Sequence, residues 1–438
     1  MKLLFLAHRI PYPPNKGDKI RSFHQLRALV ERGHEVHLLA FADDAGDLGY
    51  QVDLAKLCAS VQIVPLNRQW AQVRALRSLF SAQPLSLGYY ESKAMRAALQ
   101  QKLAEEQFDA VFVYSSTMAQ YVPRELASRT LVDMVDVDSE KWLDYARKVS
   151  AAQAWLYKLE WKRLRRYEQE IVSTYGYTLL TTPREAALLN QVDEFTRRAR
   201  LRTLTNGVDL VHYRPEPWRL RVLDKLPLHE RQWFADPSAP RLVFTGAMDY
   251  YANIEGVKFF AEAILPLVRE REPRAEFLIV GSKPTEEVKQ LGRLPGVQVT
   301  GFVEDVRPYL QAATVCVMPL RIARGVQNKV LEAMAAAKAI VATPEAVAGL
   351  NVTDGEHLLL AHSPRKLAEH IVNLIRNEEL RRELGENARS FVEEHHDWAP
   401  LLQRFAELLE TLALRNGKAK LSVQELLNQG GLGQTALR

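Results

Sequence analysis

The chain has 438 residues, which is too long for one ordinary hydrophobic core and predicts two domains of roughly 200 residues each. Its apolar content of 47% and charged content of 25% are typical of globular proteins, and a net charge of +5 permits an anionic partner such as a nucleotide. The two cysteines, Cys58 and Cys316, fit neither a disulfide framework nor a zinc site, so we expect a reducing, cytoplasmic location.

The N-terminal stretch MKLLFLAHRIPYPP predicts a buried strand, because its apolar run from Leu3 to Ala7 is shorter than the core of a signal peptide. No stretch holds about 18 consecutive apolar residues, so any membrane contact is expected to be peripheral. A glycine loop and the helix IRSFHQLRALVERG follow, with Gly33 at the C-cap, and then the strand EVHLLAF. This strand–helix–strand order predicts a parallel sheet, and the alternation continues to residue 211.

Residues 212–240 carry five prolines and no clean period, which predicts a linker between two domains. A second α/β series runs over 241–395, from RLVFTGA to HLLLA. Two such halves leave a cleft, and ligands bind beyond the carboxyl ends of parallel strands. We expect a last helix over 396–415, surface positions for His395 and His396, and a weakly ordered tail over 416–438.

The segment RGVQNKVLEAMA joins a glycine turn to the start of an amphipathic helix. Free backbone N–H groups at a helix start favour an anion, and Gly325 allows the backbone to approach a phosphate. Glu332 then stands where a carboxylate can accept hydrogen bonds from two neighbouring hydroxyls, as a ribose offers. The alternative is a plain strand–helix turn with a surface glutamate.

Two further glycines stand where a ligand can approach the backbone. Gly17 precedes a helix and its loop can hold a phosphate or a sugar, although a proline-rich turn explains the same residues. The loop matches neither the Walker A spacing nor the dinucleotide glycine pattern. Gly301 ends a strand in VTGFVEDV, where a flat ring can lie against the backbone.

The acidic run DMVDVDSEKW follows a strand of the first half. Asp133, Asp136 and Asp138 can orient acceptor hydroxyls or take up a proton. With no histidine beside them, we expect no metal site. The alternative is a helix N-cap at Ser139 preceded by loop aspartates.

Two helical stretches of the first half mix basic residues with tryptophan and leucine, as interfacial helices do. They are RQWAQVRALRSLF at 68–80 and WLYKLEWKRLRR at 155–166. They favour peripheral contact with an anionic inner-membrane surface, or else are solvated helix faces whose tryptophans pack onto the domain. The basic residues do not follow a nucleic-acid-reading motif.

The order GDKIRS, GHEV, TNGVD, FTGAM, VGSKP, VTGFVEDV, GVQNKVLEAMA and VAT resembles GT-B glycosyltransferases of glycosyltransferase family 4. The segments DMVDVDSEKW and GVQNKVLEAMA resemble, more narrowly, the sugar transferases of exosortase (PEP-CTERM) exopolysaccharide loci. The resemblance implies two Rossmann-like domains facing across a cleft, with a last helix crossing back to the first domain. It also implies metal-independent, retaining transfer without a cofactor, from a nucleoside-diphosphate sugar to a glycan or lipid-linked acceptor.

The resemblance implies roles for single residues as well. Glu332 matches the ribose-binding carboxylate, and the amides of Gly325 and Val326 match those that face the donor sugar and diphosphate. With Lys19 and Arg21 reaching in from the first domain, the expected donor-binding residues are Gly17, Lys19, Arg21, Gly246, Gly301, Phe302, Val303, Gly325, Val326, Gln327, Asn328 and Glu332.

Two positions depart from the family pattern. Arg324 stands where the first of two paired glutamates belongs, eight residues before Glu332, and the first-domain loop that often carries a histidine holds Ser115 and Ser116. We expect Arg324 and Lys329 to stabilise the leaving diphosphate, Asp136 and Asp138 to act at the acceptor, and Ser115, Ser116 and Asp133 to line its side. The alternatives are a nucleotide-sugar epimerase of the same fold and a non-catalytic nucleotide- or glycan-binding subunit.

Overall fold

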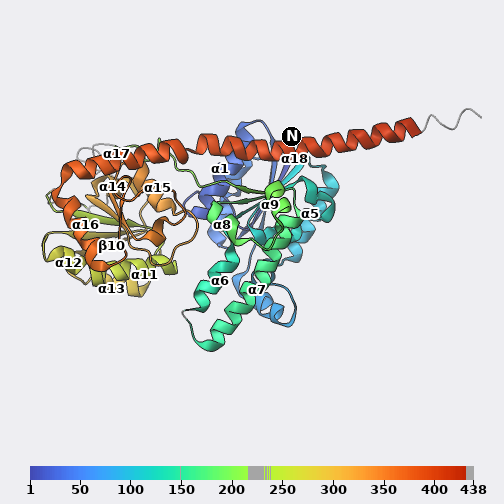
Figure 1. Ribbon diagram of the computed structural model, residues 1–438. Helices are drawn as coiled ribbons and strands as arrows, with labels where there is room; N and C mark the ends of the chain where they lie inside the picture. The colour runs from blue at the N-terminus through green and yellow to red at the C-terminus, as the bar shows by residue number, and fades with distance from the viewer. Residues whose placement is uncertain (148, 216–230, 232–233, 235, 237, 431–438) are drawn as a thin grey trace, which may run out of the picture. The chain divides into compact units, whose positions relative to one another are not determined.

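A computed structural model describes residues 1–147, 149–215, 231, 234, 236 and 238–430 of the chain. The chain divides into two compact units (Figure 1). Unit 1 holds residues 1–204 together with the segment from 399 onward, and unit 2 holds residues 205–398. Both α/β halves expected from the sequence are therefore present.

The sheet of unit 1 has seven parallel strands within the described residues, in the order β3-β2-β1-β4-β5-β6-β7. Because helices cover both faces of such a sheet, its inner strands are continuous apolar runs, as AVFVY in β4 illustrates. The strands are β1 (Lys2–Ala7), β2 (Glu35–Ala42), β3 (Ser60–Pro65), β4 (Ala110–Tyr114), β5 (Thr130–Val135), β6 (Tyr177–Leu180) and β7 (Leu201–Thr203).

The helices of unit 1 connect these strands. The helix predicted after the first glycine loop begins at Gly17, and Gly33 follows its end with φ of +78°, a left-handed conformation that favours glycine. The α-helices are α1 (Gly17–Glu31), α2 (Gln51–Ala55), α3 (Arg68–Arg77), α4 (Leu85–Tyr90), α5 (Lys93–Glu105), α6 (Asp138–Ala146), α7 (Ala151–Thr174), α8 (Pro183–Leu188) and α9 (Glu194–Arg200). Short 3-10 turns are η1 (Ala45–Tyr50), η2 (Ser78–Phe80), η3 (Ser116–Tyr121) and η4 (Arg124–Arg129).

The last helix, α18 (Trp398–Gly430), packs on one face of the first sheet. The Phe405 ring lies 4.9 Å from that of Phe112 on β4, and Leu409 is fully buried beside it. The carboxylate of Glu410 accepts hydrogen bonds from Arg32 and pairs with His34, both at 3.0 Å. The expected return of the C-terminal helix to the first domain is confirmed.

The boundaries differ from those expected. The helix predicted over 396–415 begins at Trp398 and continues to Gly430, because KAKLSVQELLNQ contains no helix-breaking proline; the tail was expected to begin at 416. Residues 431–438 and most of the linker expected over 212–240 lie outside the described residues. Unit 1 ends at Leu204 rather than at 211, since the TNGVD segment packs within unit 2.

The sheet of unit 2 repeats the same winding. Its six described strands are parallel and lie in the order β10-β9-β8-β11-β12-β13, so that β8, like β1, stands where the strand order reverses. The strands are β8 (Arg241–Thr245), β9 (Glu276–Val280), β10 (Val297–Gly301), β11 (Val315–Met318), β12 (Ile340–Ala342) and β13 (Leu359–Leu360).

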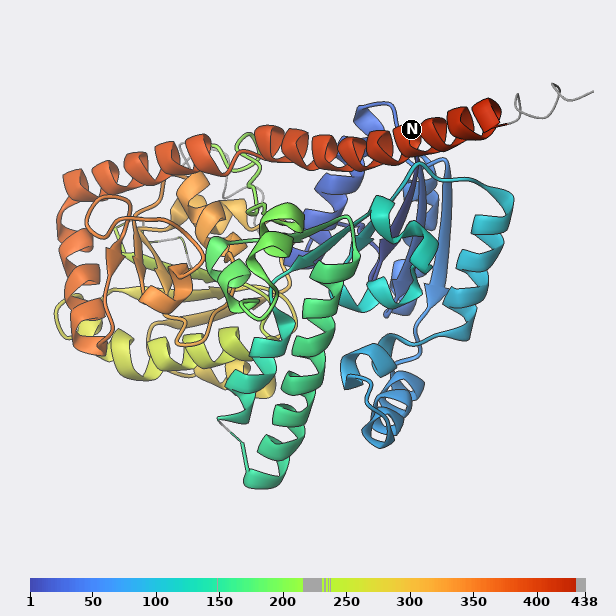
Figure 2. The same ribbon diagram turned by 45° about the vertical axis from the view of Figure 1, so that its right-hand side comes forward.

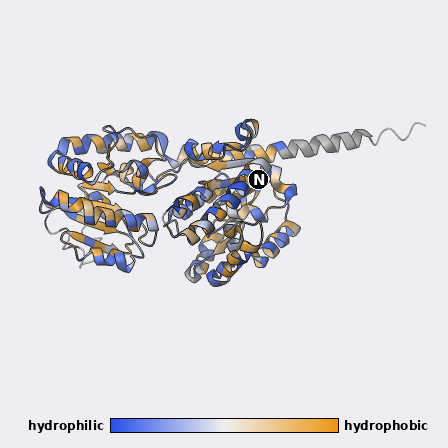
Figure 3. Cartoon of the chain, turned by 60° about the horizontal axis from the view of Figure 1, so that its bottom comes forward, coloured by the Kyte–Doolittle hydropathy of each residue, from blue (hydrophilic) through white to orange (hydrophobic). Residues whose placement is uncertain are grey.

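The helices of unit 2 cover a single apolar core built on this sheet. They are α11 (Tyr251–Phe259), α12 (Leu265–Arg269), α13 (Glu286–Leu291), α14 (Arg307–Ala312), α15 (Asn328–Ala335), α16 (Pro364–Arg376) and α17 (Glu378–His395), with a π-turn η8 (Phe260–Ile264) and a 3-10 turn η9 (Pro344–Val347). Arg389 of α17 donates to the Ala335 carbonyl at the end of α15, at 2.6 Å. In both units the strands carry apolar residues and the helices show both apolar and polar ones (Figure 3).

Among the described residues, every helix falls short of the length or the apolar character needed to cross a bilayer.

Candidate functional site

The predicted anion site at the start of α15 has the local geometry that its sequence suggests. Gly325 adopts φ of +61°, a left-handed conformation, and the side-chain amide of Gln327 closes the loop by donating to the Arg324 carbonyl at 2.8 Å. Val326 is buried in the core of unit 2 and anchors the loop. The free N–H groups at the start of α15 are thereby fixed at the carboxyl edge of the sheet.

A glycine that sequence reasoning missed supports this loop from behind. A Cβ atom on Gly349, just after η9, would lie 2.1 Å from the Gly325 carbonyl oxygen and 3.0 Å from the Val326 nitrogen. Only a residue without a side chain lets the two backbones approach so closely. The signal in the sequence was weak, since Gly349 stands in an unremarkable turn.

The TNGVD segment holds the first residue of α15. Asn206 donates from its side-chain amide to Asn328 Oδ1 at 2.9 Å, and its carbonyl accepts from His396 Nδ1 at 2.7 Å. His396 is 5% exposed and burial lowers its pKa, so the expected surface position is wrong. Its position is explained by the chain doubling back beside residues 206–208, where Val208 N–H donates to the His396 carbonyl.

Lys329 reaches from α15 to the carboxyl end of β8. Its ammonium lies 4.3 Å from the centre of the Phe244 ring and donates to Asn253 Oδ1. A Cβ atom on Gly246 would lie 2.7 Å from the side-chain nitrogen of Asn253 and 3.0 Å from the Lys329 ammonium, so a side chain there would force both groups to shift. Lys329 is therefore held by unit 2 and is not a freely solvated charge, and Asn253 is a residue that sequence reasoning missed.

Glu332 lies one turn further along α15 and interacts with Lys329 and Tyr213. Burial raises the pKa of Glu332 to about 7, although the charge of Lys329 and a hydrogen bond from the Tyr213 hydroxyl both act to lower it. Burial likewise lowers the pKa of Lys329 to about 7, although the negative charge of Glu332 acts to raise it. A partly buried acid and base whose pKa values both lie near 7 are typical of functional sites.

The segment predicted to face a flat ring has the expected backbone. Gly301 ends β10 with φ of +77°. Phe302 is 71% exposed, and Val303 packs against the core. Beside them Asp305 and Arg307 form an ion pair at 2.7 Å, with electrostatic links to His212 and Tyr213. This places an exposed aromatic ring next to the turn, within unit 2.

The backbones that follow β8 and β9 touch each other. A Cβ atom on Gly281 would lie 1.7 Å from the Gly246 carbonyl oxygen. Gly281 stands in the VGSKP segment, and its exact role was not predicted from the sequence. The contact brings the carboxyl ends of two neighbouring strands into one surface around the Lys329 ammonium.

In unit 1 the structure corrects three of the predicted contacts. Arg21 and Asp133 are 1% and 0% exposed and pair with each other at 2.8 Å, and Gln25 donates to the same carboxylate. Lys19, 4% exposed, pairs with Asp47 at 2.9 Å. Because α1 turns these side chains onto the rest of unit 1, they hold the domain together and do not face a ligand directly. Gly17 is exposed, at the first turn of α1.

Asp136 and Asp138 lie at the carboxyl end of β5, as predicted. Asp136 accepts from the Thr181 hydroxyl at 2.9 Å, and Asp138 from the Lys141 ammonium at 2.7 Å. Lys141 also lies 3.6 Å from Asp136 and so links the two carboxylates. Both aspartates are partly exposed and remain able to meet a ligand.

The strands next to this edge carry unusual backbone conformations. Ser115 after β4 has φ of +81° and Val135 at the end of β5 has φ of +68°, left-handed values that cost free energy for residues with side chains. The Ser115 hydroxyl pairs with that of Thr117 at 3.0 Å. Ser116 is 1% exposed, so the expected direct contact between Ser116 and an acceptor is wrong: the turn directs its side chain inward.

His8 is a further residue that sequence reasoning missed. It follows β1, beside the reversal of strand order, and its ring stacks on Tyr114 with centroids 5.7 Å apart. His8 Nε2 lies 3.6 Å from Asp18. Although burial works in the opposite direction, His8 and Arg9 hold the pKa of Asp18 well below its usual range. The available signal was a histidine directly after the first strand.

Comparisons with known proteins give matches on both halves of the chain. Residues 20–207 match the model of the glycosyl transferase 4-like domain, and residues 239–377 match that of glycosyl transferases group 1. An uncharacterized 44.6 kDa protein in the cps region of Klebsiella pneumoniae is 20% identical over 407 residues, covering 90% of this chain and 96% of the relative.

Solved structures share the fold. Sucrose-phosphate synthase from Thermosynechococcus elongatus matches with a TM-score of 0.67 at 17% identity, covering 94% of this chain and 99% of its own. HepE of Anabaena, solved in complex with UDP, matches with a TM-score of 0.64 at 14% identity, covering 94% and 100%. With both halves matched by glycosyltransferase models and two parallel sheets wound alike, the protein is a glycosyltransferase of the GT-B fold.

Proposed function

We propose that the protein transfers a sugar from a nucleoside-diphosphate sugar to a glycan or lipid-linked glycan acceptor. The observation that carries the proposal is the arrangement at the start of α15, where the Gly325 loop and the Lys329 ammonium meet at the carboxyl ends of β8 and β11. The structure of HepE with UDP, which shares the fold, supports a nucleotide donor. The expected donor residues of unit 2 all belong to this edge or to the turn after β10.

The donor diphosphate binds at the helix start. Its negative charge faces the amides that follow Gly325, and Lys329 supplies a positive charge fixed by Phe244 and Asn253. Glu332 accepts hydrogen bonds from the ribose hydroxyls, and the Tyr213 hydroxyl orients its carboxylate. The nucleobase lies against the Gly301 turn beside Phe302.

Transfer breaks the bond between the anomeric carbon and the diphosphate oxygen, and the nucleoside diphosphate leaves with the electron pair. The acceptor hydroxyl oxygen bonds to that carbon on the same face, so that the anomeric configuration is retained. Fixed amides, Lys329 and Arg324 stabilise the charge that develops on the leaving group. We assign proton uptake from the acceptor to Asp136 or Asp138, with Ser115 on the acceptor side.

We propose that transfer requires neither a cofactor nor a bound metal. Within the described part of the chain, no group of three His, Cys, Asp or Glu side chains is arranged to hold a metal ion. The charge that a metal would supply is available from Lys329 and the start of α15.

We further place the reaction in exopolysaccharide biosynthesis of the exosortase-associated type, on the cytoplasmic side of the membrane. The DMVDVDSEKW and GVQNKVLEAMA segments support this placement, as does the relative named from a cps region. The cysteines Cys58 and Cys316 are both buried and unpaired, in keeping with a reducing compartment.

Two assays test the proposal. A panel of nucleotide sugars is first screened for thermal stabilisation, because a bound donor raises the melting temperature by mass action. The stabilising donor is then incubated with glycan and lipid-linked acceptors, and free nucleoside diphosphate is measured. Acceptor-dependent release supports transfer. Donor binding without release indicates a binding subunit, and conversion of the sugar without an acceptor indicates an epimerase; either result would contradict the proposal.

A further inference from the structure

Helix α3 presents its large apolar side chains to solvent. Its buried residue is Ala71, whereas Trp70 is 61% exposed and Leu76 is 56% exposed. Phe80, at the end of the following turn η2, is 94% exposed. A helix that packs onto its own domain normally buries such residues and exposes the small and polar ones. The polarity of α3 is reversed, which points to a partner outside unit 1.

Basic side chains flank this apolar row. The stretch RQWAQVRALRSLF contains three arginines and no acidic residue. Arg77 is exposed, and Arg68 is exposed while pairing with Asp43 at 3.2 Å. We call the surface formed by Trp70, Val73, Leu76 and Phe80 with Arg68 and Arg77 the α3 face.

The α3 face is held rigidly by α7. Arg163 donates to the Ser78 carbonyl at 2.9 Å and also to that of Gln83, on either side of Phe80. Glu160, fully buried, accepts from the backbone N–H groups of Leu85 and Ser86. Phe80 is therefore exposed on an anchored turn.

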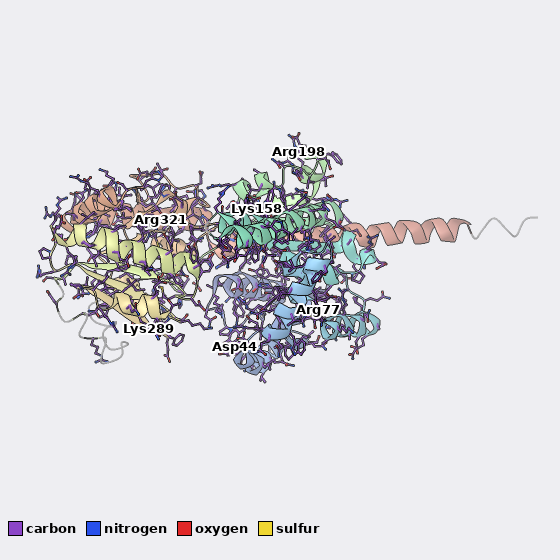
Figure 4. The ribbon with its side chains drawn as sticks, turned by 90° about the horizontal axis from the view of Figure 1, so that it is seen from below. Asp44, Arg77, Lys158, Arg198, Lys289 and Arg321 are labelled. Carbon is purple, nitrogen blue, oxygen red and sulfur yellow. The ribbon has the colours of Figure 1, made fainter. Side chains whose placement is uncertain are left out.

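Helix α7 adds a second row of the same character. Trp155 is 65% exposed, and Lys158 and Lys162 are exposed one and two turns further along. The α3–η2 segment and α7 lie next to each other in the lower part of unit 1 (Figures 1 and 2). Arg77 and Lys158 are both seen when the molecule is viewed from below (Figure 4).

We propose that the α3 face, together with Trp155 and Lys158, docks on the surface of an anionic lipid bilayer. Tryptophan and phenylalanine favour the boundary between headgroups and acyl chains, and arginine and lysine are attracted to anionic headgroups. The exposed charged residues that flank the apolar side chains, Arg68, Arg77, Lys158 and Lys162, are all basic, which favours an anionic bilayer over a protein partner. The choice of a lipid partner agrees with the lipid-linked acceptor in the proposed function, but the binding itself does not depend on that activity.

The test uses the full chain and vesicles of phosphatidylglycerol and phosphatidylethanolamine, with pure phosphatidylcholine vesicles as the comparison. Flotation should bring the protein up with the anionic vesicles and far less with the neutral ones, and added salt should release it. Replacing Trp70 and Phe80 together by serine (W70S/F80S) should lower the bound fraction roughly tenfold. Arg77→Glu should lower it by roughly fivefold or more.

The matched control is F195S/R198E on α9, where Phe195 is 83% exposed and Arg198 also faces solvent. These substitutions remove an equally exposed aromatic and a charge from another element, and they should leave binding unchanged. Circular dichroism establishes that each variant is folded.

Binding that is equal for neutral and anionic vesicles, or equally weakened by the control, would overturn the inference. An absence of vesicle binding by the wild-type protein would also overturn it. The same holds if W70S/F80S abolishes self-association of the protein and the wild-type protein binds no vesicles. Nucleoside diphosphate release with a soluble acceptor is measured in parallel. Nucleoside diphosphate release by a wild-type protein that does not bind the vesicles would overturn the membrane inference alone, whereas vesicle binding by a wild-type protein that releases no nucleoside diphosphate would overturn the proposed function alone.

Discussion

Lys329 and Glu332 form a titrating pair within the proposed donor site, since burial brings the pKa of each to about 7. An acid and a base coupled in this way titrate as a unit. A nucleotide sugar carries a diphosphate diester whose charge does not change near neutrality. Any pH dependence of donor binding in this range must therefore come from the protein.

We expect donor affinity to be highest near pH 7. As the pH rises through about 7, Lys329 loses its proton and its attraction for the diphosphate; as the pH falls through about 7, Glu332 gains a proton and accepts fewer hydrogen bonds. On each limb of the profile, above and below pH 7, donor affinity should change by up to about tenfold per pH unit, which is the slope expected for one linked proton. Titration calorimetry between pH 5.5 and about pH 9 measures the profile.

The two limbs can be assigned separately. Lys329→Met should remove the alkaline limb and Glu332→Gln the acidic one. A profile that keeps both limbs in both variants would show that other groups titrate.

Arg324 stands at the start of the same loop, in the position where the family pattern has a glutamate. If its charge acts on the leaving diphosphate, Arg324→Ala should lower turnover by roughly 100-fold while the donor Kd changes by less than about threefold. Steady-state kinetics and calorimetry measure the two effects. An unchanged turnover would remove Arg324 from the mechanism.

Among the elements, the loop before α15 depends on its contact with the turn after η9. Gly349→Ala places a Cβ atom 2.1 Å from the Gly325 carbonyl and should displace the loop by several tenths of an ångström. A displacement of that order should lower turnover by roughly 10- to 100-fold, with a small loss of melting temperature.

Gly49→Ala is the matched control for this substitution, because nothing lies within 4 Å of a Cβ atom at Gly49. Equal turnover in the two variants would show that the loop does not need its present position.

The ion pair between Arg21 on α1 and Asp133 on β5 ties a helix to the sheet of unit 1. Asp133→Asn leaves the guanidinium buried without its counter-charge, and we expect the free energy of unfolding of unit 1 to fall by roughly 3–5 kcal/mol. Urea unfolding followed by tyrosine and tryptophan fluorescence measures it. A loss below about 1 kcal/mol would indicate that water reaches the pair.

At the level of elements the sequence is informative about strands and glycine turns, because strand apolar runs and helix starts are local patterns. The start of α15, the left-handed Gly301 and Gly325 and the aspartates after β5 follow from such patterns. Such patterns do not predict which way a side chain points, as the buried side chains of Lys19, Arg21, Asp133 and Ser116 show. Which side of a helix or turn meets the core depends on partners that stand about 30 to 110 residues away in the chain, such as Asp47 for Lys19.

For the molecule as a whole, the two sheets share one winding, and this could be inferred from the alternation of strands and helices. The boundaries could not. Leu204 ends unit 1 because Asn206 bonds to α15, and α18 returns to the first sheet because Phe405 and Leu409 find their apolar neighbours there. Asn253 and Gly349 escaped prediction for the same reason, since each acts only through a distant segment.

The central claim is that the donor diphosphate binds where the Gly325 loop and the Lys329 ammonium meet, at the edge of the second sheet. Its most direct test is calorimetric titration of the donor found in the thermal screen into the wild-type protein, Lys329→Met and Lys366→Met. Lys366 pairs with Glu369 on the exposed side of α16 and serves as the matched control. We expect Kd to rise by roughly 10-fold or more at pH 6.5 for Lys329→Met alone; equal Kd values in all three proteins would contradict this binding site.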